Sequence, residues 1–191
     1  MQEGHALVAL LRVVTEENAQ RSAPRPLLLK IAPALSNEAL AEIIGVCEEF
    51  GLAGMIATNT TLDHGALRGA DETGGLSGSP LRARATEVVR FLRGRTRLPL
   101  IGVGGICDAA SSREKLEAGA ELLQIYTGYI YRGPRLLANE RGPVVIRQET
   151  ARAASVAQIV GLAPREASPG NDGTEDWARL RHNHCYNYRN N

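Results

Sequence analysis

The sequence predicts an α/β fold in which helices cover a parallel sheet. Short, nearly continuous apolar segments alternate with amphipathic segments of helical period, the pattern of buried parallel strands joined by helices. At 191 residues, the chain is long enough for one domain with its own core. Its 22 Lys and Arg residues against 21 Asp and Glu leave no basic excess, which argues against a nucleic-acid partner.

The first predicted elements are a helix, a strand and a second helix. Apolar residues recur at helical spacing between Ala6 and Val14, namely Leu7, Leu10, Leu11 and Val14. The segment 27–31 predicts a short buried strand that Pro33 ends. Ser36 is a good N-cap for the next helix, and Gly51 is a natural residue to follow its end. The apolar stripe of that helix consists of Leu40, Ile43, Ile44, Cys47 and Phe50.

Three further strands are expected, over residues 55–58, 99–103 and 122–126. A long polar loop with several glycines follows the first of them, and a helix from about Leu81 ends near Gly94. Asp108 is a candidate cap for a helix that stops at Gly119. The order is compatible with an open doubly wound sheet or with a (β/α)₈ barrel, although four strands are too few to close a barrel alone.

Beyond Asn139 the composition changes. Residues 141–160 contain helix-compatible stretches, whereas from Pro164 the chain is rich in Gly, Pro, Asn, Ser and charged residues, as in disordered tails. We therefore expect a domain over residues 1–140 and a divergent, partly disordered tail over 141–191. The tail contains His182, His184 and Cys185, but without a structured frame these predict no metal site.

The three cysteines are far apart and lack metal-ligand spacing, so neither a disulfide framework nor a zinc site is expected. Cys47 is predicted to act as a small buried hydrophobe. No apolar run is long enough to span a bilayer, and Met1 to His5 have no secretory pattern. Any membrane attachment is therefore expected from sequence that these residues do not contain.

Three features lie at predicted strand ends, where α/β folds bind ligands. Gly102-Val103-Gly104-Gly105 allows backbone N–H groups to approach an anion, and Tyr126-Thr127-Gly128 could complete such a phosphate site. Lys30 stands in an apolar strand, where a cation must be paired or face a cavity. Thr58-Asn59-Thr60-Thr61 offers donors and acceptors to a polar planar ligand.

Each feature also has a purely structural interpretation. The glycines could form a tight turn, Lys30 could extend to solvent, and the Asn-Thr run could be a hydrogen-bonded turn. No Asp, His or Cys stands out as a proton-transfer group at these strand ends. The residues alone therefore predict a phosphate-bearing ligand with a lysine beside it.

Five ordered segments carry a family resemblance: Leu29-Lys30-Ile31-Ala32-Pro33, Ile56-Ala57-Thr58-Asn59-Thr60-Thr61, Thr73-Gly74-Gly75-Leu76-Ser77-Gly78-Ser79-Pro80-Leu81, Ile101-Gly102-Val103-Gly104-Gly105-Ile106 and Gln124-Ile125-Tyr126-Thr127-Gly128. In order and spacing they resemble class 2, quinone-dependent dihydroorotate dehydrogenases from Gln2 to about Leu137. The resemblance implies the C-terminal half of a (β/α)₈ TIM barrel, strands five to eight, binding FMN.

The resemblance also implies site residues and a reaction. The positions matching FMN-binding residues are Lys30, Thr58, Gly78, Gly105, Tyr126 and Thr127, and those matching orotate-binding residues are Asn59 and Thr60. In the family, which serves pyrimidine (UMP) biosynthesis, a serine base removes the C5 proton of dihydroorotate, the C6 hydride moves to FMN, and a quinone reoxidises the flavin. The family is associated with the bacterial or mitochondrial inner membrane through an N-terminal region that is not in this chain.

Three departures from the family pattern bear on activity. The sequence begins after the serine-bearing Asn-x-Ser-x-Pro-Asn segment, so no catalytic residue is assigned. Ala34 stands where the family usually has aspartate, and the residues after Asn139 do not match the final barrel helix. We therefore expect a truncated, inactive fragment, itself soluble.

Two alternatives remain. One is a non-catalytic half-barrel that self-associates and binds a phosphate ligand, because exposed sheet edges favour pairing. The other is a different FMN or phosphate-binding barrel, such as a dihydrouridine synthase or an IMP dehydrogenase-like protein. That second alternative would make the Asn59-Thr60 pair and the Gly-Leu-Ser-Gly segment coincidences.

Overall fold

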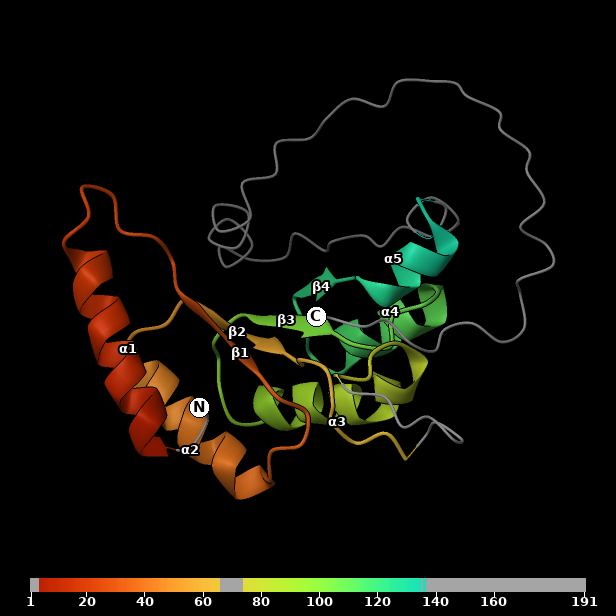
Figure 1. Ribbon diagram of the computed structural model, residues 1–191, viewed down its shortest axis with the longest axis horizontal. Helices are drawn as coiled ribbons and strands as arrows, with labels where there is room; N and C mark the ends of the chain where they lie inside the picture. Colours follow the sequence, from red (N-terminus) through yellow and green to blue (C-terminus); the bar gives the residue numbers. More distant parts are fainter. Residues whose placement is uncertain (1–3, 66–73, 135, 137–191) are drawn as a thin grey trace.

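Four parallel strands form a sheet in a computed structural model, which describes residues 4–65, 74–134 and 136 (Figure 1). The strands are β1 (Leu28–Ile31), β2 (Gly54–Ala57), β3 (Leu100–Val103) and β4 (Leu122–Gln124), and they pair in that order. Each strand is joined to the next through a helix, as parallel pairing requires. The predicted α/β fold is confirmed, while the predicted tail lies outside the described residues.

The strand register sorts side chains onto two faces of the sheet. Lys30 pairs with Ile56, Ile56 with Ile101, and Ile101 with Leu122, so these four positions form one row. Their neighbours Ile31, Met55, Ala57 and Leu100 point to the other face and are fully buried. That buried face packs against the helices, whereas Lys30 is exposed on the other face.

Helices α1 (Gly4–Ala19) and α2 (Asn37–Glu49) lie side by side on the helical face of the sheet (Figure 1). The Ser36 side chain accepts a hydrogen bond from the Ala39 N–H, which confirms the predicted N-cap. At the other end, the Gly51 N–H donates to the Glu48 carbonyl and the Leu52 N–H to the Cys47 carbonyl. Gly51 has a φ of +62°, so α2 ends in a Schellman motif. Gly51 follows the end of the helix, as the sequence predicted.

The helix that follows β3 begins at a defined cap. A short 3-10 turn, η1 (Ser79–Leu81), leads into α3 (Arg82–Arg93), and α4 (Ala109–Glu117) follows β3. Asp108 accepts a hydrogen bond from the Ser111 N–H at 2.8 Å, and the Ser111 hydroxyl accepts one from the Asp108 N–H at 3.0 Å. This reciprocal capping box fixes where α4 begins and confirms Asp108 as its cap.

The end of the described chain differs from the predicted pattern. The sequence reasoning ended with the fourth strand, but a short helix, α5 (Thr127–Arg132), begins three residues after β4. Its six residues are too few to show an amphipathic period, so the helical pattern could not be recognised. The chain leaves α5 at Gly133, whose φ is +62°.

The core lies between the sheet and the helices. It includes the α2 stripe Leu40, Ile43, Ile44 and Cys47, together with Val88, Val89 and Leu92 of α3. Burial raises the pKa of the Cys47 thiol to about 11, and the nearby Glu48 charge adds to this effect. Cys47 is therefore a neutral core side chain, as predicted.

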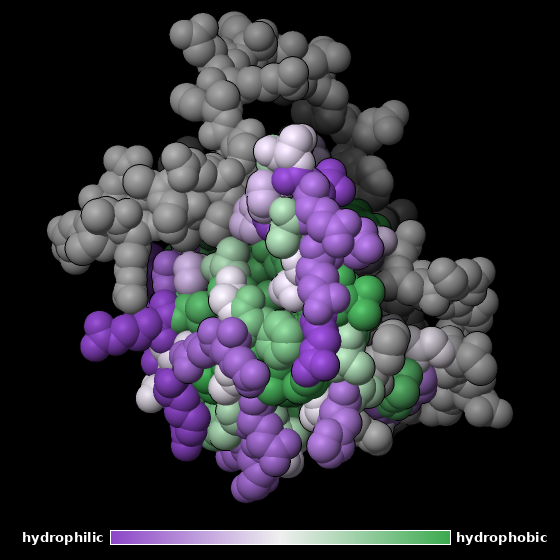
Figure 2. Space-filling view, turned by 90° about the vertical axis from the view of Figure 1, so that its left-hand side faces the viewer, coloured by the Kyte–Doolittle hydropathy of each residue, from purple (hydrophilic) through white to green (hydrophobic). Residues whose placement is uncertain are grey.

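Helix α1 buries only part of its apolar stripe. Leu7 and Leu11 are buried, whereas Leu10 is 44%, Val13 59% and Val14 36% exposed. The helical spacing of Leu10 and Val14 therefore predicts the helix correctly but does not mark a buried face, because α1 packs chiefly against α2. Figure 2 views this side of the molecule and shows apolar surface framed by polar side chains.

Within the described ranges, no helix is long and apolar enough to cross a membrane.

Lys115 is buried between α3 and α4. Its side chain is fully inaccessible, and its ammonium donates to the Thr86 hydroxyl at 2.6 Å and to the Arg82 carbonyl at 3.2 Å. Burial lowers the pKa of Lys115 from 10.5 to about 8; the charges of Arg82 and Arg90 act in the same direction, and that of Glu114 opposes them. Burying this cation therefore costs stability wherever it stays protonated.

We predict that Lys115 makes the free energy of unfolding rise with pH between about 8 and 10.5. In that range the unfolded chain holds the lysine proton that the folded chain has lost, so stability increases, by at most about 3 kcal/mol. Denaturant unfolding across this range, compared with Lys115→Met, isolates the effect because all other titratable groups are the same in both proteins. Identical pH slopes for the two proteins would contradict the prediction.

Candidate functional site

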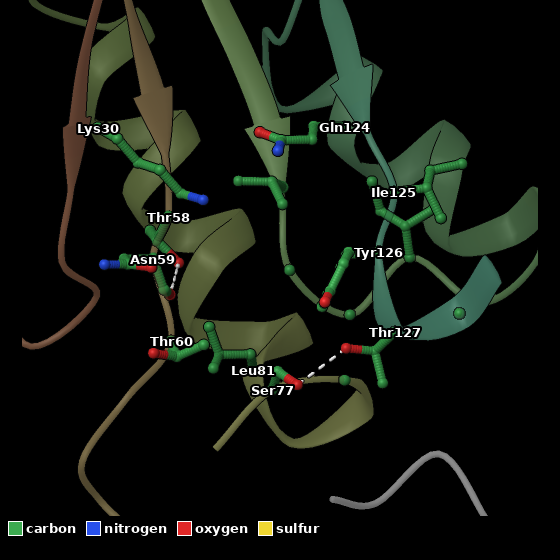
Figure 3. A pocket seen from close by; sticks show the side chains of 16 residues that line it. Lys30, Thr58, Asn59, Thr60, Ser77, Leu81, Gln124, Ile125, Tyr126 and Thr127 are labelled. Carbon is green, nitrogen blue, oxygen red and sulfur yellow. Dashed lines mark hydrogen bonds between the residues drawn. The ribbon is translucent and has the colours of Figure 1, made fainter. Parts of the chain in front are cut away.

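A pocket of about 240 Å³ opens at the carboxyl edge of the sheet (Figure 3). Because all four strands are parallel, the segments that follow them meet at this edge. The residues that line the pocket come from or after all four strands and from the segment before α3: Lys30; Thr58, Asn59 and Thr60; Ser77, Gly78 and Leu81; Val103, Gly104, Gly105 and Ile106; and Gln124, Ile125, Tyr126, Thr127 and Gly128.

The wall formed by β1 and β2 carries polar side chains on a fixed backbone. The Thr58 N–H donates to the Val103 carbonyl at 3.1 Å, and the Asn59 N–H donates to the Ile31 carbonyl at 2.7 Å. Thr58 is buried, and its hydroxyl donates to the Asn59 carbonyl. The peptide bond before Thr58 is cis. Figure 3 shows the Lys30 side chain extending from β1 into the pocket that Thr58 also lines.

The segment after β1 is held in place by α3. The Arg84 guanidinium donates to the Pro33 carbonyl at 2.9 Å and to the Leu35 carbonyl at 2.7 Å. The two carbonyls lie on either side of Ala34, the position at which the family resemblance predicts an aspartate. Arg84 thus fixes the path of the chain immediately after Lys30 without a side-chain carboxylate at Ala34.

Glycines form the wall that follows β3. Gly104 and Gly105 have φ values of +100° and +73°, a region that residues with a Cβ rarely adopt. A Cβ on Gly105 would lie only 2.4 Å from both the Cα and the Cβ of Arg82. The turn therefore rests directly on the first turn of α3, and glycine is required there for both conformation and space.

The wall that follows β4 is tied to the segment before α3. The hydroxyl groups of Ser77 and Thr127 are 2.8 Å apart and share a hydrogen bond, drawn in Figure 3. A Cβ on Gly128 would lie 2.1 Å from the Ile106 carbonyl oxygen, so the start of α5 packs closely on the segment after β3. Thr127 is buried, while Tyr126 is about half exposed at the rim.

The charge and donor groups of the lining fit an anionic, polar ligand better than a metal ion. Lys30 is the only cationic side chain among the lining residues, and none of them is a carboxylate, histidine or cysteine. In the described part of the chain, no three His, Cys, Asp or Glu side chains are grouped to hold a metal. Hydroxyl and amide groups from Thr58, Asn59, Thr60 and Gln124 supply neutral hydrogen-bonding partners.

Comparison with known proteins identifies the family. A family model described as dihydroorotate dehydrogenase matches residues 1–140. The chain belongs to the dihydroorotate dehydrogenase family. A dihydroorotate dehydrogenase (quinone) from Christiangramia forsetii is 49% identical over 141 residues, which cover 72% of this chain and 42% of that protein. A dihydroorotate dehydrogenase (quinone) from Chloroflexus aurantiacus is 49% identical over 148 residues, which cover 71% of this chain and 41% of that protein.

Solved dihydroorotate dehydrogenases agree with the fold. The Eimeria tenella enzyme, solved in complex with ferulenol, superposes with a TM-score of 0.66 and 31% identity over 73% of this chain and 44% of the enzyme chain. Its ligand-free form gives a TM-score of 0.66 at 33% identity. The predicted resemblance to the quinone-dependent class is confirmed. The chain spans less than half the length of the relatives that it matches.

The structure brings every site residue predicted from the dihydroorotate dehydrogenase resemblance into this one pocket. The residues predicted to bind FMN (Lys30, Thr58, Gly78, Gly105, Tyr126 and Thr127) and those predicted to bind orotate (Asn59 and Thr60) all line it. Sequence reasoning missed Ser77, Leu81 and Gln124. Gln124 could have been noticed as the polar residue of an apolar strand, and Ser77 belongs to the recognised Gly-Leu-Ser-Gly segment.

We predict that Gly105→Ala destabilises the chain more than Gly51→Ala does. Both glycines have positive φ, but a Cβ at Gly51 would have no heavy atom within 4 Å. Gly51→Ala should therefore cost only the conformational strain, about 1–2 kcal/mol, and Gly105→Ala about 1–3 kcal/mol more through overpacking. Urea unfolding of both variants measures the difference, and equal losses would mean that the turn after β3 does not rest on Arg82.

Proposed function

We propose that this chain forms the FMN- and orotate-binding part of a quinone-dependent dihydroorotate dehydrogenase. The observation that carries the proposal is the placement of Lys30, Asn59 and the glycine turn after β3 around one pocket. The family membership supports the same reaction, the oxidation of dihydroorotate to orotate in pyrimidine biosynthesis.

The end of the pocket formed by β3 and β4 suits a phosphate. Gly78, Gly104 and Gly105 expose their backbone to the pocket without side chains. The hydroxyl groups of Ser77 and Thr127, which are hydrogen-bonded to each other, line the same pocket. Positive φ values at all three glycines turn the backbone into conformations that can direct N–H groups toward an anion. In the proposal, Gly78, Gly105, Tyr126 and Thr127 hold the FMN phosphate.

The opposite end suits the flavin ring and the substrate. Lys30 and Thr58 line the pocket on the β1 and β2 side, where a cation favours negative charge on a bound ring. Asn59 and Thr60 follow directly and offer amide and hydroxyl groups to orotate. A pocket of 240 Å³ is smaller than the roughly 300–1,000 Å³ of most small-molecule sites, which fits a shared site of which these residues form one side.

FMN supplies the redox chemistry when bound, accepting the C6 hydride of dihydroorotate and passing electrons to a quinone. The described residues of this chain bind and orient the cofactor and the substrate. Lys30 provides positive charge near the flavin ring, and Asn59 and Thr60 hold the substrate ring in place. The C5 proton requires a base, yet the lining residues include no carboxylate, histidine or cysteine, and the one lining serine, Ser77, shares its hydroxyl hydrogen bond with Thr127. The family serine motif Asn-x-Ser-x-Pro-Asn does not occur in these 191 residues.

We infer that proton removal needs a serine from outside this sequence and that this chain alone is inactive. Quinone access and attachment to the inner membrane would likewise come from segments that these residues do not contain. The chain would then act as the cofactor-holding half of a larger barrel.

A second candidate function is a self-associating half-barrel that binds a phosphate ligand without turnover. Two observations favour it. Helix α1 exposes Leu10, Val13 and Val14, and β1 and β4 are the edges of the described sheet, with backbone groups that can pair with another strand. A second copy could cover these surfaces.

We predict that the purified chain binds FMN but gives no dihydroorotate-dependent quinone reduction. Flavin fluorescence titration measures binding, and quinone reduction by the same sample measures turnover. Turnover by the chain alone would contradict the proposed division of the site.

Analytical ultracentrifugation with FMN tests the second candidate function, the self-associating half-barrel. A dimer would support self-association, and a flavin-free monomer would contradict it.

We predict that Lys30→Ala weakens FMN binding about tenfold or more, because one charge-assisted contact contributes about 1.5–3 kcal/mol. The titration should include Lys30→Met, which keeps the apolar stem, and Lys30→Arg, which keeps the charge. Weak FMN binding by Lys30→Ala and Lys30→Met, with binding recovered in Lys30→Arg, would assign the effect to the charge of the side chain. Unchanged FMN affinity in Lys30→Ala would show that the lysine only extends to solvent.

A further inference from the structure

Helix α4 holds Arg82 through two consecutive residues. Glu114 accepts a hydrogen bond from the Arg82 guanidinium at 2.7 Å, and this bond is the main cause of the lowered pKa of Glu114. Lys115 donates to the carbonyl oxygen of the same arginine at 3.2 Å. Both the side chain and the backbone of Arg82 are therefore fixed by neighbouring positions of one helix.

The bond to the Arg82 carbonyl belongs to a closed triangle. The Thr86 hydroxyl donates to this carbonyl at 2.8 Å and accepts from the Lys115 ammonium at 2.6 Å. Thr86 and Lys115 are both buried, so water cannot replace either bond without reorganisation. A buried polar triangle of this kind defines one arrangement of the first turn of α3.

Arg82 in turn supports the glycine turn at the pocket. A Cβ placed on Gly105 would meet the Arg82 Cα and Cβ at 2.4 Å and its backbone nitrogen at 2.7 Å. A Cβ on Gly102 would lie 3.5 Å from the Cβ and Cδ of Lys115. The Lys115 stem thus packs beside β3 just before the turn, while its ammonium fixes the helix on which the turn rests.

We propose that Lys115 is a positioning residue for the anion-binding turn Gly104–Gly105, acting through the Arg82 carbonyl. Lys115 does not line the pocket, so it contacts no ligand and acts only on the position of the turn. The inference rests on the proposed function, in which this turn holds the FMN phosphate. A change at Lys115 should therefore affect recognition of the phosphate and leave recognition of the flavin ring unchanged.

The experiment compares FMN with riboflavin, which has the same ring but no phosphate, on the full chain. Lys115→Met keeps the length and apolar stem of the side chain but removes its hydrogen-bond donor. We expect a dissociation constant about tenfold higher for FMN and an unchanged one for riboflavin. In ¹⁵N-glycine NMR spectra without ligand, the Gly104 and Gly105 amide signals should move.

Arg93→Met is the matched control. Arg93 is a second largely buried cation, which donates to the Leu98 and Thr96 carbonyls and to Glu121 at the far end of α3. Its loss should disturb the fold comparably without altering the ratio of FMN to riboflavin affinity or the two glycine signals. If Lys115→Met does not fold, Thr86→Val opens the same triangle and should give the same signature.

Each outcome decides the inference. Unchanged FMN affinity and unchanged glycine signals in Lys115→Met would overturn it. Equal weakening of FMN and riboflavin would also overturn it, because that result indicates a general structural role. If the unmodified chain binds no FMN, the proposed cofactor site fails, and the glycine signals alone decide whether Lys115 positions the turn.

Discussion

The parallel register of the four strands is the constraint on which the site depends. It pairs Lys30 with Ile56, Ala57 with Gly102 and Val103 with Gln124, so the segments that follow the strands meet at one edge. A slip of β1 by one residue would turn Lys30 to the helical face, because side chains alternate along a strand. There it would replace a fully buried apolar residue such as Ile31 with a cation, whose burial is costly.

Local patterns predicted most of the fold correctly. Ser36, Gly51 and Asp108 were recognised as helix-end residues because capping depends on groups within a few residues of one another. The exposure of Leu10 and Val14 was not predictable in the same way, because it depends on which element packs against α1. Helix α5 was missed because six residues are too short to show a helical period.

Two kinds of sequence evidence predicted the site: the chemistry of single residues and the order of five motifs. Residue chemistry alone placed Lys30, the glycine turn and the Asn-Thr run at strand ends but left a structural interpretation open for each. The order of the five motifs favours the functional interpretation, and all the residues predicted from them line one pocket. Lys115 and Arg82 could not be found from sequence, because their link to Gly105 is a contact between α4, α3 and the turn after β3.

A crystal structure of the chain with FMN would test the central claim most directly. We expect the phosphate beside Gly105 and Thr127, with the flavin ring against Lys30 and Thr58 and its exposed face toward Asn59. A flavin bound in the reverse direction, with its phosphate at Lys30, would contradict the proposed roles of Lys30 and the glycine turn. So would a flavin bound away from the carboxyl edge of the sheet.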